Sequence, residues 1–190
     1  MMNVTHAHDN LLLAIDVGTS SVRACLFHAD GVLAGLGQAP YATTYPRPGW
    51  AEVDAEQWWS GFVKALGFAC NAAGASPSKI RGIGLSTLFP AFIPFDDAGR
   101  PLRPAILYSD QRSIEQVRML EQSGAADILQ RTTSNRVAPG TFAVSSLLWL
   151  RACEPEIFEQ AAFFGTVNAL FTLRLTGQSC IDTTGASLFG

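Results

Sequence analysis

Short apolar runs separated by tight turns occupy the first 42 residues. Leu11 to Val17 is apolar except for Asp16, Val22 to Phe27 is a second such run, and Val32 to Ala42 is a weaker third. A Gly-Thr-Ser-Ser segment and an Asp-Gly pair stand between the runs, and such residues favour turns. The pattern therefore predicts three strands in an antiparallel meander.

A helical period replaces the strand pattern after Asp54. Asp54 is a favoured N-cap, with Gln57 three positions later as its capping-box partner, and Gly74 and Pro77 end the helix. Apolar side chains recur along one face, at Trp58, Trp59, Phe62, Val63, Leu66, Ala69, Cys70 and Ala73. We therefore interpret the two tryptophans as core residues in preference to a ligand platform.

The rest of the chain begins with strands and ends mostly with helices. Strands are predicted over Ile80–Ser86, Ala91–Phe95 and Leu102–Tyr108, the last at an edge or bulge because Pro104 interrupts it. Helices are predicted from Ile114 to Gly124, over 125–131, 143–153 and 166–176, with a short one beginning at Pro155. This order predicts an α/β fold with a mixed sheet flanked by helices.

Composition and charge exclude several classes of protein. Of 190 residues, 48% are hydrophobic and 15% charged, and the net charge of −3 gives no basic excess to attract nucleic acid or a membrane surface. No apolar stretch approaches the roughly 18 residues that span a bilayer. The four cysteines are far apart and form no metal-ligand pair. We expect a cytoplasmic protein without nucleic-acid or membrane partners, with residues 1–10 as a flexible polar tail.

The sharpest candidate site is the octapeptide Asp16-Val17-Gly18-Thr19-Ser20-Ser21-Val22-Arg23. Gly18 can adopt a positive φ angle, and the three amides that follow it can then converge on one anion. Asp16, at the end of a strand, can hold magnesium, which favours one or two carboxylates plus water and phosphate oxygens. Arg23 adds a positive charge. A plain hairpin capped by its serines accounts for the same residues equally well.

Further segments resemble a known family in their shared order and spacing. They are Ala14–Ala24, Pro48–Asp54, Trp58-Trp59, Ile83–Ser86, Asp97–Leu107, Asp110–Arg112, Leu147–Leu150, and Arg174–Gly177 followed by Asp182. Together they resemble the amino-terminal domain of the FGGY carbohydrate kinases, the family of glycerol kinase and xylulokinase. The resemblance extends from about Leu11 to the end of the chain.

This resemblance implies an actin-like, ribonuclease H-like fold, in which two related α/β domains enclose a cleft. Residues 11–190 would form part of the first domain, and the second, ATP-binding domain would lie outside this chain. The resemblance also implies that the octapeptide faces ATP and Mg²⁺. Asp16 would hold the metal, and the phosphates would be bound by Gly18, Thr19, Ser20, Ser21 and Arg23.

Substrate contacts are implied after the strand that ends at Ser86. Phe89 and Pro90 stand where glycerol kinase has Arg-Glu and xylulokinase has Met-His, so neither substrate can be carried over. Tyr108 matches an aromatic residue that lies against the substrate. The resemblance thus implies substrate binding by Leu88, Phe89, Tyr108 and Asp110. Two alternatives stay open, namely that Phe89 packs in the core and that Asp110 pairs with Arg112 to hold its loop.

We therefore expect the N-terminal part of an ATP-dependent kinase acting on a sugar or polyol. No catalytic base is expected in this chain, since the family's aspartate would lie beyond Gly190, so the chain by itself should be inactive. A homodimer is one option for the full-length protein. A hypothesis of another class is a non-catalytic nucleotide- or sugar-binding module that retains the kinase fold. An actin-like assembly ATPase would share the octapeptide but not the Pro48–Asp54 segment.

Overall fold

The computed structural model describes residues 10–189, so the predicted tail lies outside the described residues except for Asn10. The chain divides into two units that interleave along the sequence. One unit contains residues 10–42 and 56–88, and the other contains residues 43–55 and 89–189. Each unit has its own sheet, and each is described separately below.

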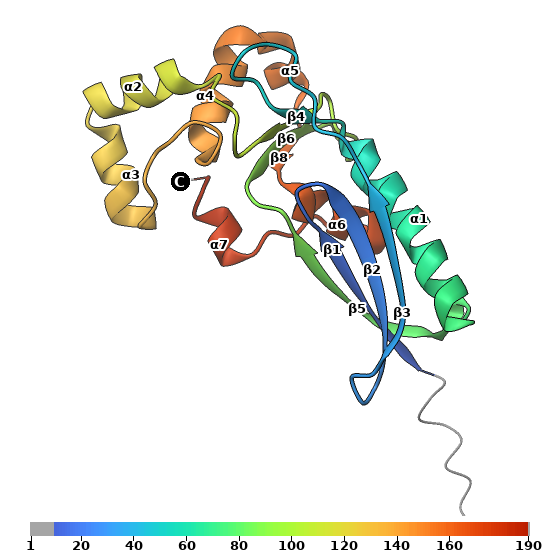
Figure 1. Cartoon of the computed structure of the whole chain (residues 1–190). Helices are drawn as coiled ribbons and strands as arrows, with labels where there is room; N and C mark the ends of the chain where they lie inside the picture. The colour runs from blue at the N-terminus through green and yellow to red at the C-terminus, as the bar shows by residue number, and fades with distance from the viewer. Residues whose placement is uncertain (1–9, 190) are drawn as a thin grey trace, which may run out of the picture. The chain divides into compact units, whose positions relative to one another are not determined.

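The predicted meander forms the sheet of the first unit (Figure 1). β1 (Leu11–Val17), β2 (Ser21–His28) and β3 (Leu33–Pro40) pair in antiparallel order. β5 (Ile80–Thr87) joins the other side of β1 in parallel, so the order is β3-β2-β1-β5. The predicted mixed sheet is confirmed, and β1 lies in its interior.

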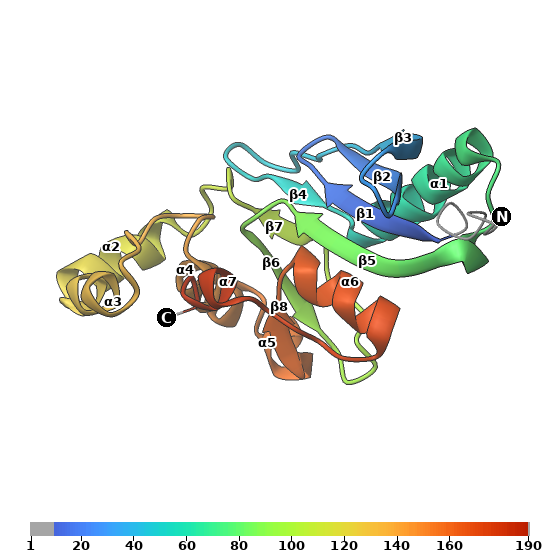
Figure 2. The same cartoon turned by 90° about the horizontal axis from the view of Figure 1, so that it is seen from below.

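Helix α1 (Ala55–Ala73) covers one face of this sheet (Figure 2). Every second side chain of β1 is buried, beginning at Leu11 and ending at Val17, because alternate residues of a strand face the same side. Trp58 of α1 is fully buried, which confirms its interpretation as a core residue. The side chain of Gln57 bonds to the backbone N and O of Ala42, at 3.2 and 3.5 Å.

Glycine allows β3 and α1 to approach closely. A Cβ atom added at Gly37 would lie 1.9 Å from the backbone O of Ala65 and 2.8 Å from the backbone N of Ala69. We predict that Gly37→Ala lowers the free energy of unfolding by about 1–3 kcal/mol, because strand or helix must move to admit the methyl group. Denaturant unfolding of the purified chain measures this change.

Gly67 provides the matched control, since a Cβ atom there meets nothing within 4 Å. It lies in the interior of α1, where alanine is favoured over glycine by about 0.5–1 kcal/mol. Gly67→Ala should therefore raise the free energy of unfolding. Equal stability of the Gly37 and Gly67 variants would contradict the close-packing interpretation.

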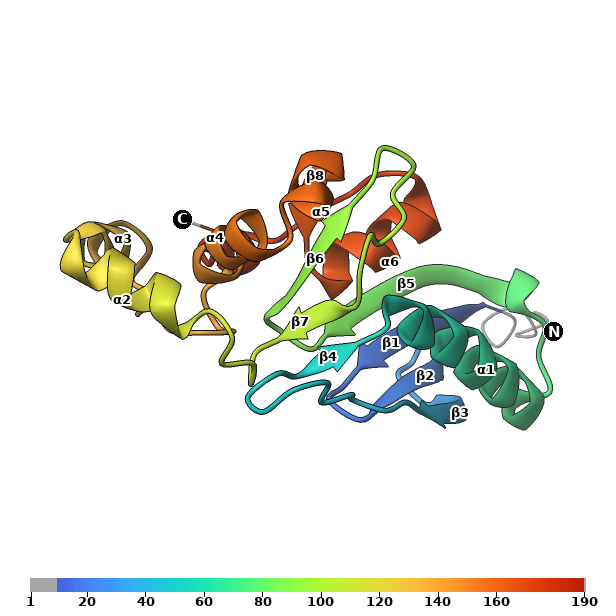
Figure 3. The same cartoon turned by 90° about the horizontal axis from the view of Figure 1, so that it is seen from above.

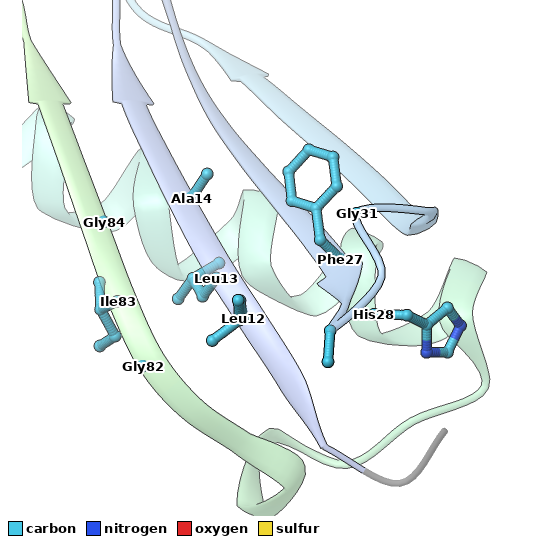
Figure 4. A pocket seen from close by; sticks show the side chains of 10 residues that line it. Leu12, Leu13, Ala14, Phe27, His28, Gly31, Gly82, Ile83 and Gly84 are labelled. Atoms are coloured by element: carbon cyan, nitrogen blue, oxygen red, sulfur yellow. The ribbon is translucent and has the colours of Figure 1, made fainter. Parts of the chain in front are cut away.

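The other face of the first sheet is apolar near the start of β1 (Figure 4) and polar at its end. Near the start of β1, Leu12, Phe27 and Ile83 line an open apolar depression of about 490 Å³, and Leu12 and Ile83 are each 49% exposed. Asp16 and Arg23 pair across β1 and β2 at the opposite end. The polar chemistry of this unit is thus concentrated where β1 ends.

The second unit contains an antiparallel sheet of order β4-β7-β6-β8 (Figure 3). Its strands are β4 (Glu52–Val53), β7 (Ala105–Leu107), β6 (Ala91–Phe95) and β8 (Phe163–Gly165). β4 and β8 were not predicted, because two or three residues cannot establish an alternating pattern. The edge or bulged position predicted for Leu102–Tyr108 is wrong, because the strand begins after Pro104, lies between β4 and β6, and pairs with both without a bulge.

Five of the six α-helices described in the second unit agree closely with the predicted segments, and the short α7 was not predicted. The six helices are α2 (Ile114–Gln122), α3 (Ala125–Thr133), α4 (Ala143–Cys153), α5 (Pro155–Gln160), α6 (Val167–Thr176) and α7 (Thr183–Ala186). Phe92 and Ile106 of the sheet pack with Trp149 and Leu150 of α4 in a buried cluster. A membrane-crossing length of apolar helix is found nowhere in residues 10–189.

Candidate functional site

The hairpin between β1 and β2 carries the residues predicted to bind phosphate. Gly18 N donates to Ser21 O at 3.0 Å, so the chain reverses at Thr19 and Ser20. The positive φ expected for Gly18 is wrong, because this bond continues the ladder of β1 and β2 by one step and leaves the reversal to the next two residues. A Cβ atom at Gly18 would make only ordinary contacts, so the backbone itself does not require glycine.

The backbone amides at the tip of the hairpin are available to a ligand. The N–H groups of Thr19 and Ser20 donate no hydrogen bond to any residue in the described range 10–189. Both residues are exposed, whereas Ser21 is buried and its hydroxyl accepts a bond from Gln38 Nε2 at 3.0 Å. The side chain of Ser21 therefore braces the turn, and its predicted phosphate contact stays a prediction.

Asp16 and Arg23 face each other across the two strands. Arg23 Nη1 lies 2.8 Å from Asp16 Oδ2, and both side chains are 44% exposed. An ion pair this exposed contributes only about 0–1 kcal/mol, so a ligand can open it at little cost. Asp16 thus presents a carboxylate, and Arg23 a guanidinium, to the same end of the sheet.

The donor set fits a magnesium ion bound mostly by phosphate and water. Within the described part of the chain, no group of three or more His, Cys, Asp or Glu side chains could hold a metal. One carboxylate is nevertheless enough for Mg²⁺, which usually keeps several waters and takes its other ligands from substrate phosphates. Asp16 is the side chain in the turn that meets this requirement.

Cys25 lies on β2, two residues after Arg23, and is the cysteine nearest to the turn in sequence. Burial, followed by the negative charge of Asp16, raises the pKa of its thiol, against a smaller opposing effect of Arg23. A thiol with a raised pKa stays protonated near neutral pH and is a poor nucleophile. The raised pKa therefore gives this cysteine no nucleophilic role at the turn.

The predicted substrate loop begins beside the turn. Asp16 pairs with Ser86 and Val17 with Thr87 in the parallel ladder of β1 and β5, and Leu88 N donates to Val17 O at 2.6 Å. Two parallel strands end at the same edge of a sheet, which is where ligand sites of open α/β sheets are found. Leu88 itself is buried.

Tyr108 and Asp110 lie in one loop of the second unit, after β7. Tyr108 is 41% exposed, so its ring is accessible. Asp110 is fully buried, and its carboxylate accepts from Ala51 N at 2.6 Å and from Arg112 N, Nε and Nη2 at 2.8 to 2.9 Å. The structure thus contains the alternative pairing of Asp110 with Arg112. Direct contact between Asp110 and a substrate would require this network to open.

The Asp110–Arg112 pair belongs to a larger buried network that the sequence did not predict. Glu52 Oε1 pairs with both Arg103 Nη2 and Arg112 Nη1, and its distance to Arg112 Nη1 is 2.8 Å. Arg103 also pairs through Nε with Glu154 Oε2, at 2.9 Å. The Arg112 guanidinium also lies over the ring of Trp50, 3.7 Å from its centroid. In the sequence, the resemblance of Pro48–Asp54 to a family segment was the one signal that Glu52 matters. The spacing of these residues along the chain did not indicate which of them form ion pairs.

The predicted site residues fall into two groups. The first unit contains Asp16, Gly18, Thr19, Ser20, Ser21, Arg23 and Leu88, and the second contains Phe89, Tyr108 and Asp110. Phe89 is half-buried, so both a substrate contact and a packing role stay open for it. Tyr41, which no sequence motif singled out, contacts the first group through Gly18 and Ser20.

Comparison with known proteins identifies the class to which this fold and turn belong. Residues 11–189 match the N-terminal domain of the FGGY family of carbohydrate kinases. The chain belongs to this family. It is 33% identical over 183 residues to the glycerol kinase of Thermococcus onnurineus (strain NA1), a match that covers 94% of this chain and 37% of that enzyme.

Solved structures support the same assignment. The xylulose kinase of Rhodospirillum rubrum matches with a TM-score of 0.86 and 28% identity, over 94% of this chain and 36% of that one. The glycerol kinase of Plasmodium falciparum, solved with ADP, matches with a TM-score of 0.82 at 23% identity and shows the fold alone. The predicted α/β fold of the actin-like ATPase type is confirmed, and the chain spans little more than a third of the length of these relatives.

Proposed function

We propose that this chain supplies the phosphate turn and part of the substrate wall of an ATP-dependent kinase that phosphorylates a hydroxyl group of a sugar or polyol. The observation that carries the proposal is the hairpin at residues 16–23, where a carboxylate, a guanidinium and two amides that have no partner among residues 10–189 lie at one strand end. Membership of the carbohydrate kinase family supports it, as do relatives named glycerol kinase and xylulose kinase.

The hairpin is suited to phosphoryl transfer because that reaction needs mostly positioning and charge stabilisation. The amides of Thr19 and Ser20 would donate to phosphate oxygens of ATP, and Arg23 would turn from Asp16 to the same phosphates. Asp16 would hold Mg²⁺, which when bound neutralises charge on the phosphate oxygens. Donors that are already oriented stabilise developing charge without reorganising during the reaction.

The substrate wall is proposed from Phe89 and Tyr108, both of the second unit, and the substrate contact expected of the buried Leu88 stays a prediction. Phe89 is half-buried and Tyr108 partly exposed, so both can offer ring surface to the carbon skeleton of a sugar. Asp110 would act on this wall by holding the loop through Arg112 and Ala51. The base that takes the hydroxyl proton is expected outside the described residues. A base of this kind typically contributes about 10²–10⁴-fold to the rate.

The test is an ADP-release assay on the protein made from the complete gene, with a panel of sugars and polyols in the presence of Mg²⁺. We expect ADP release that depends on one class of acceptor and on Mg²⁺. Binding of ATP or a sugar without any acceptor-dependent ADP release would contradict the kinase proposal. That result would instead support the non-catalytic binding module.

A further inference from the structure

We propose that Tyr41 is the positioning residue of the phosphate turn, an inference that rests on the proposed function. Tyr41 directly follows β3 and holds the hairpin at two points. Its backbone N donates to Ser20 O at 3.1 Å, and its phenol hydroxyl donates to the carbonyl of Gly18. One residue thus binds two alternate carbonyl groups of the turn.

These two bonds determine the direction of the amides that follow. A trans peptide is planar, and its C=O and N–H groups point in opposite directions. Because the Gly18 carbonyl points to the Tyr41 hydroxyl, the N–H of Thr19 points away from it. The Ser20 carbonyl and the N–H of Ser21 are oriented by the Tyr41 backbone in the same way. Tyr41 therefore holds the carbonyls on one side of the hairpin and leaves the other side to amide donors.

Orientation matters here because a carbonyl oxygen repels a phosphate, whereas converging amide N–H groups attract it. The Gly18 amide is already used, since it donates to Ser21 O at 3.0 Å. The amide of Thr19 has no partner among residues 10–189, so its direction is decided by the Gly18 carbonyl rather than by a bond of its own. Loss of the Tyr41 hydroxyl would free the Gly18–Thr19 peptide to rotate.

Tyr41 is itself held by α1. Its ring contacts the buried Trp58 edge to face, with centroids 6.0 Å apart and an interplanar angle of 85°. The next residue, Ala42, is bonded through both its N and O to the side chain of Gln57 in α1. Tyr41 therefore connects the turn to α1, a helix of 19 residues. Functional groups held by helices or strands are positioned more precisely than groups on unsupported loops.

The test is Tyr41→Phe in the protein made from the complete gene. Phenylalanine keeps the ring against Trp58 and removes only the hydroxyl that binds Gly18. We expect kcat/KM for MgATP to fall by about 10- to 100-fold, since small displacements of positioning groups have effects of this size. KM for the sugar and the melting temperature should stay close to those of the wild type. A purely structural role would lower stability and would not separate the two substrates.

Tyr45→Phe is the matched control, because Tyr45 is 72% exposed and four residues further along the chain. It should leave kcat and both KM values unchanged. A Tyr41→Phe variant with wild-type dependence on MgATP would overturn the inference while leaving the proposed function intact.

Equilibrium binding of MgATP tests the role of Tyr41 without requiring that the protein transfers phosphate. Calorimetry should show that Tyr41→Phe weakens binding of MgATP by about tenfold, the scale of one lost hydrogen bond, and leaves binding of adenosine unchanged. Equal affinity for MgATP in the variant and the wild type would overturn the role of Tyr41, whether or not the wild type transfers phosphate. A wild type that binds no MgATP would overturn both the role of Tyr41 and the phosphate-site proposal.

Discussion

Asp16→Asn in the protein made from the complete gene is expected to abolish magnesium-dependent phosphoryl transfer. Asparagine keeps the size of the side chain but removes the charge that would hold the metal. The loss should be at least about 10²–10³-fold in kcat, the range seen when one group that stabilises transition-state charge is removed. Fold stability should change little, because the ion pair with Arg23 is half exposed. ADP release measured against Mg²⁺ concentration, together with a thermal melt, checks both expectations.

Asp30→Asn is the matched control, since it makes the same chemical change in the turn that follows β2. The carboxylate of Asp30 accepts from Val32 N at 3.1 Å, a bond that an asparagine oxygen can also accept. This variant should turn over like the wild type. Unchanged turnover in Asp16→Asn would refute the metal role of Asp16.

Arg112→Met should produce the largest loss of stability. The substitution leaves the carboxylate of Asp110, which is fully buried, without its cation, and Glu52 loses one of its two arginine partners. Breaking a buried ion pair by removing one partner costs about 3–5 kcal/mol, because an uncompensated charge remains buried. The stack of the guanidinium on Trp50 is lost as well. Denaturant unfolding of the purified chain measures the difference.

Arg118→Met makes the same change in an exposed pair. Arg118 and its partner Glu115 are 56% and 66% exposed, so the variant should stay within about 0.5 kcal/mol of the wild type. Similar stability of the two methionine variants would show that the network of Glu52, Arg103, Asp110 and Arg112 does not stabilise the second unit.

Local chemistry was sufficient to predict much of the fold. The alternation of buried residues in β1, the helical period of α1 and the turn residues between strands each act over a few positions, so they are visible in the sequence. The residue types of the octapeptide at Asp16 are visible in the same way, and its role as an anion and metal site stays a prediction. The φ angle of Gly18 was predicted wrongly because a glycine permits a positive φ without requiring it.

The contacts that shape the site join distant parts of the chain. Tyr41 holds Gly18 across 23 positions, Asp110 holds Ala51 across 59, and Glu52 meets Arg103 across 51. Such pairings depend on how strands and loops are brought together, and no spacing rule relates their residues. The sequence by itself determined most of the longer elements, the family resemblance and the chemical types at the turn. Only the tertiary structure decided which residue orients the turn and that Asp110 is buried, because orientation and burial depend on packing between residues far apart in the chain.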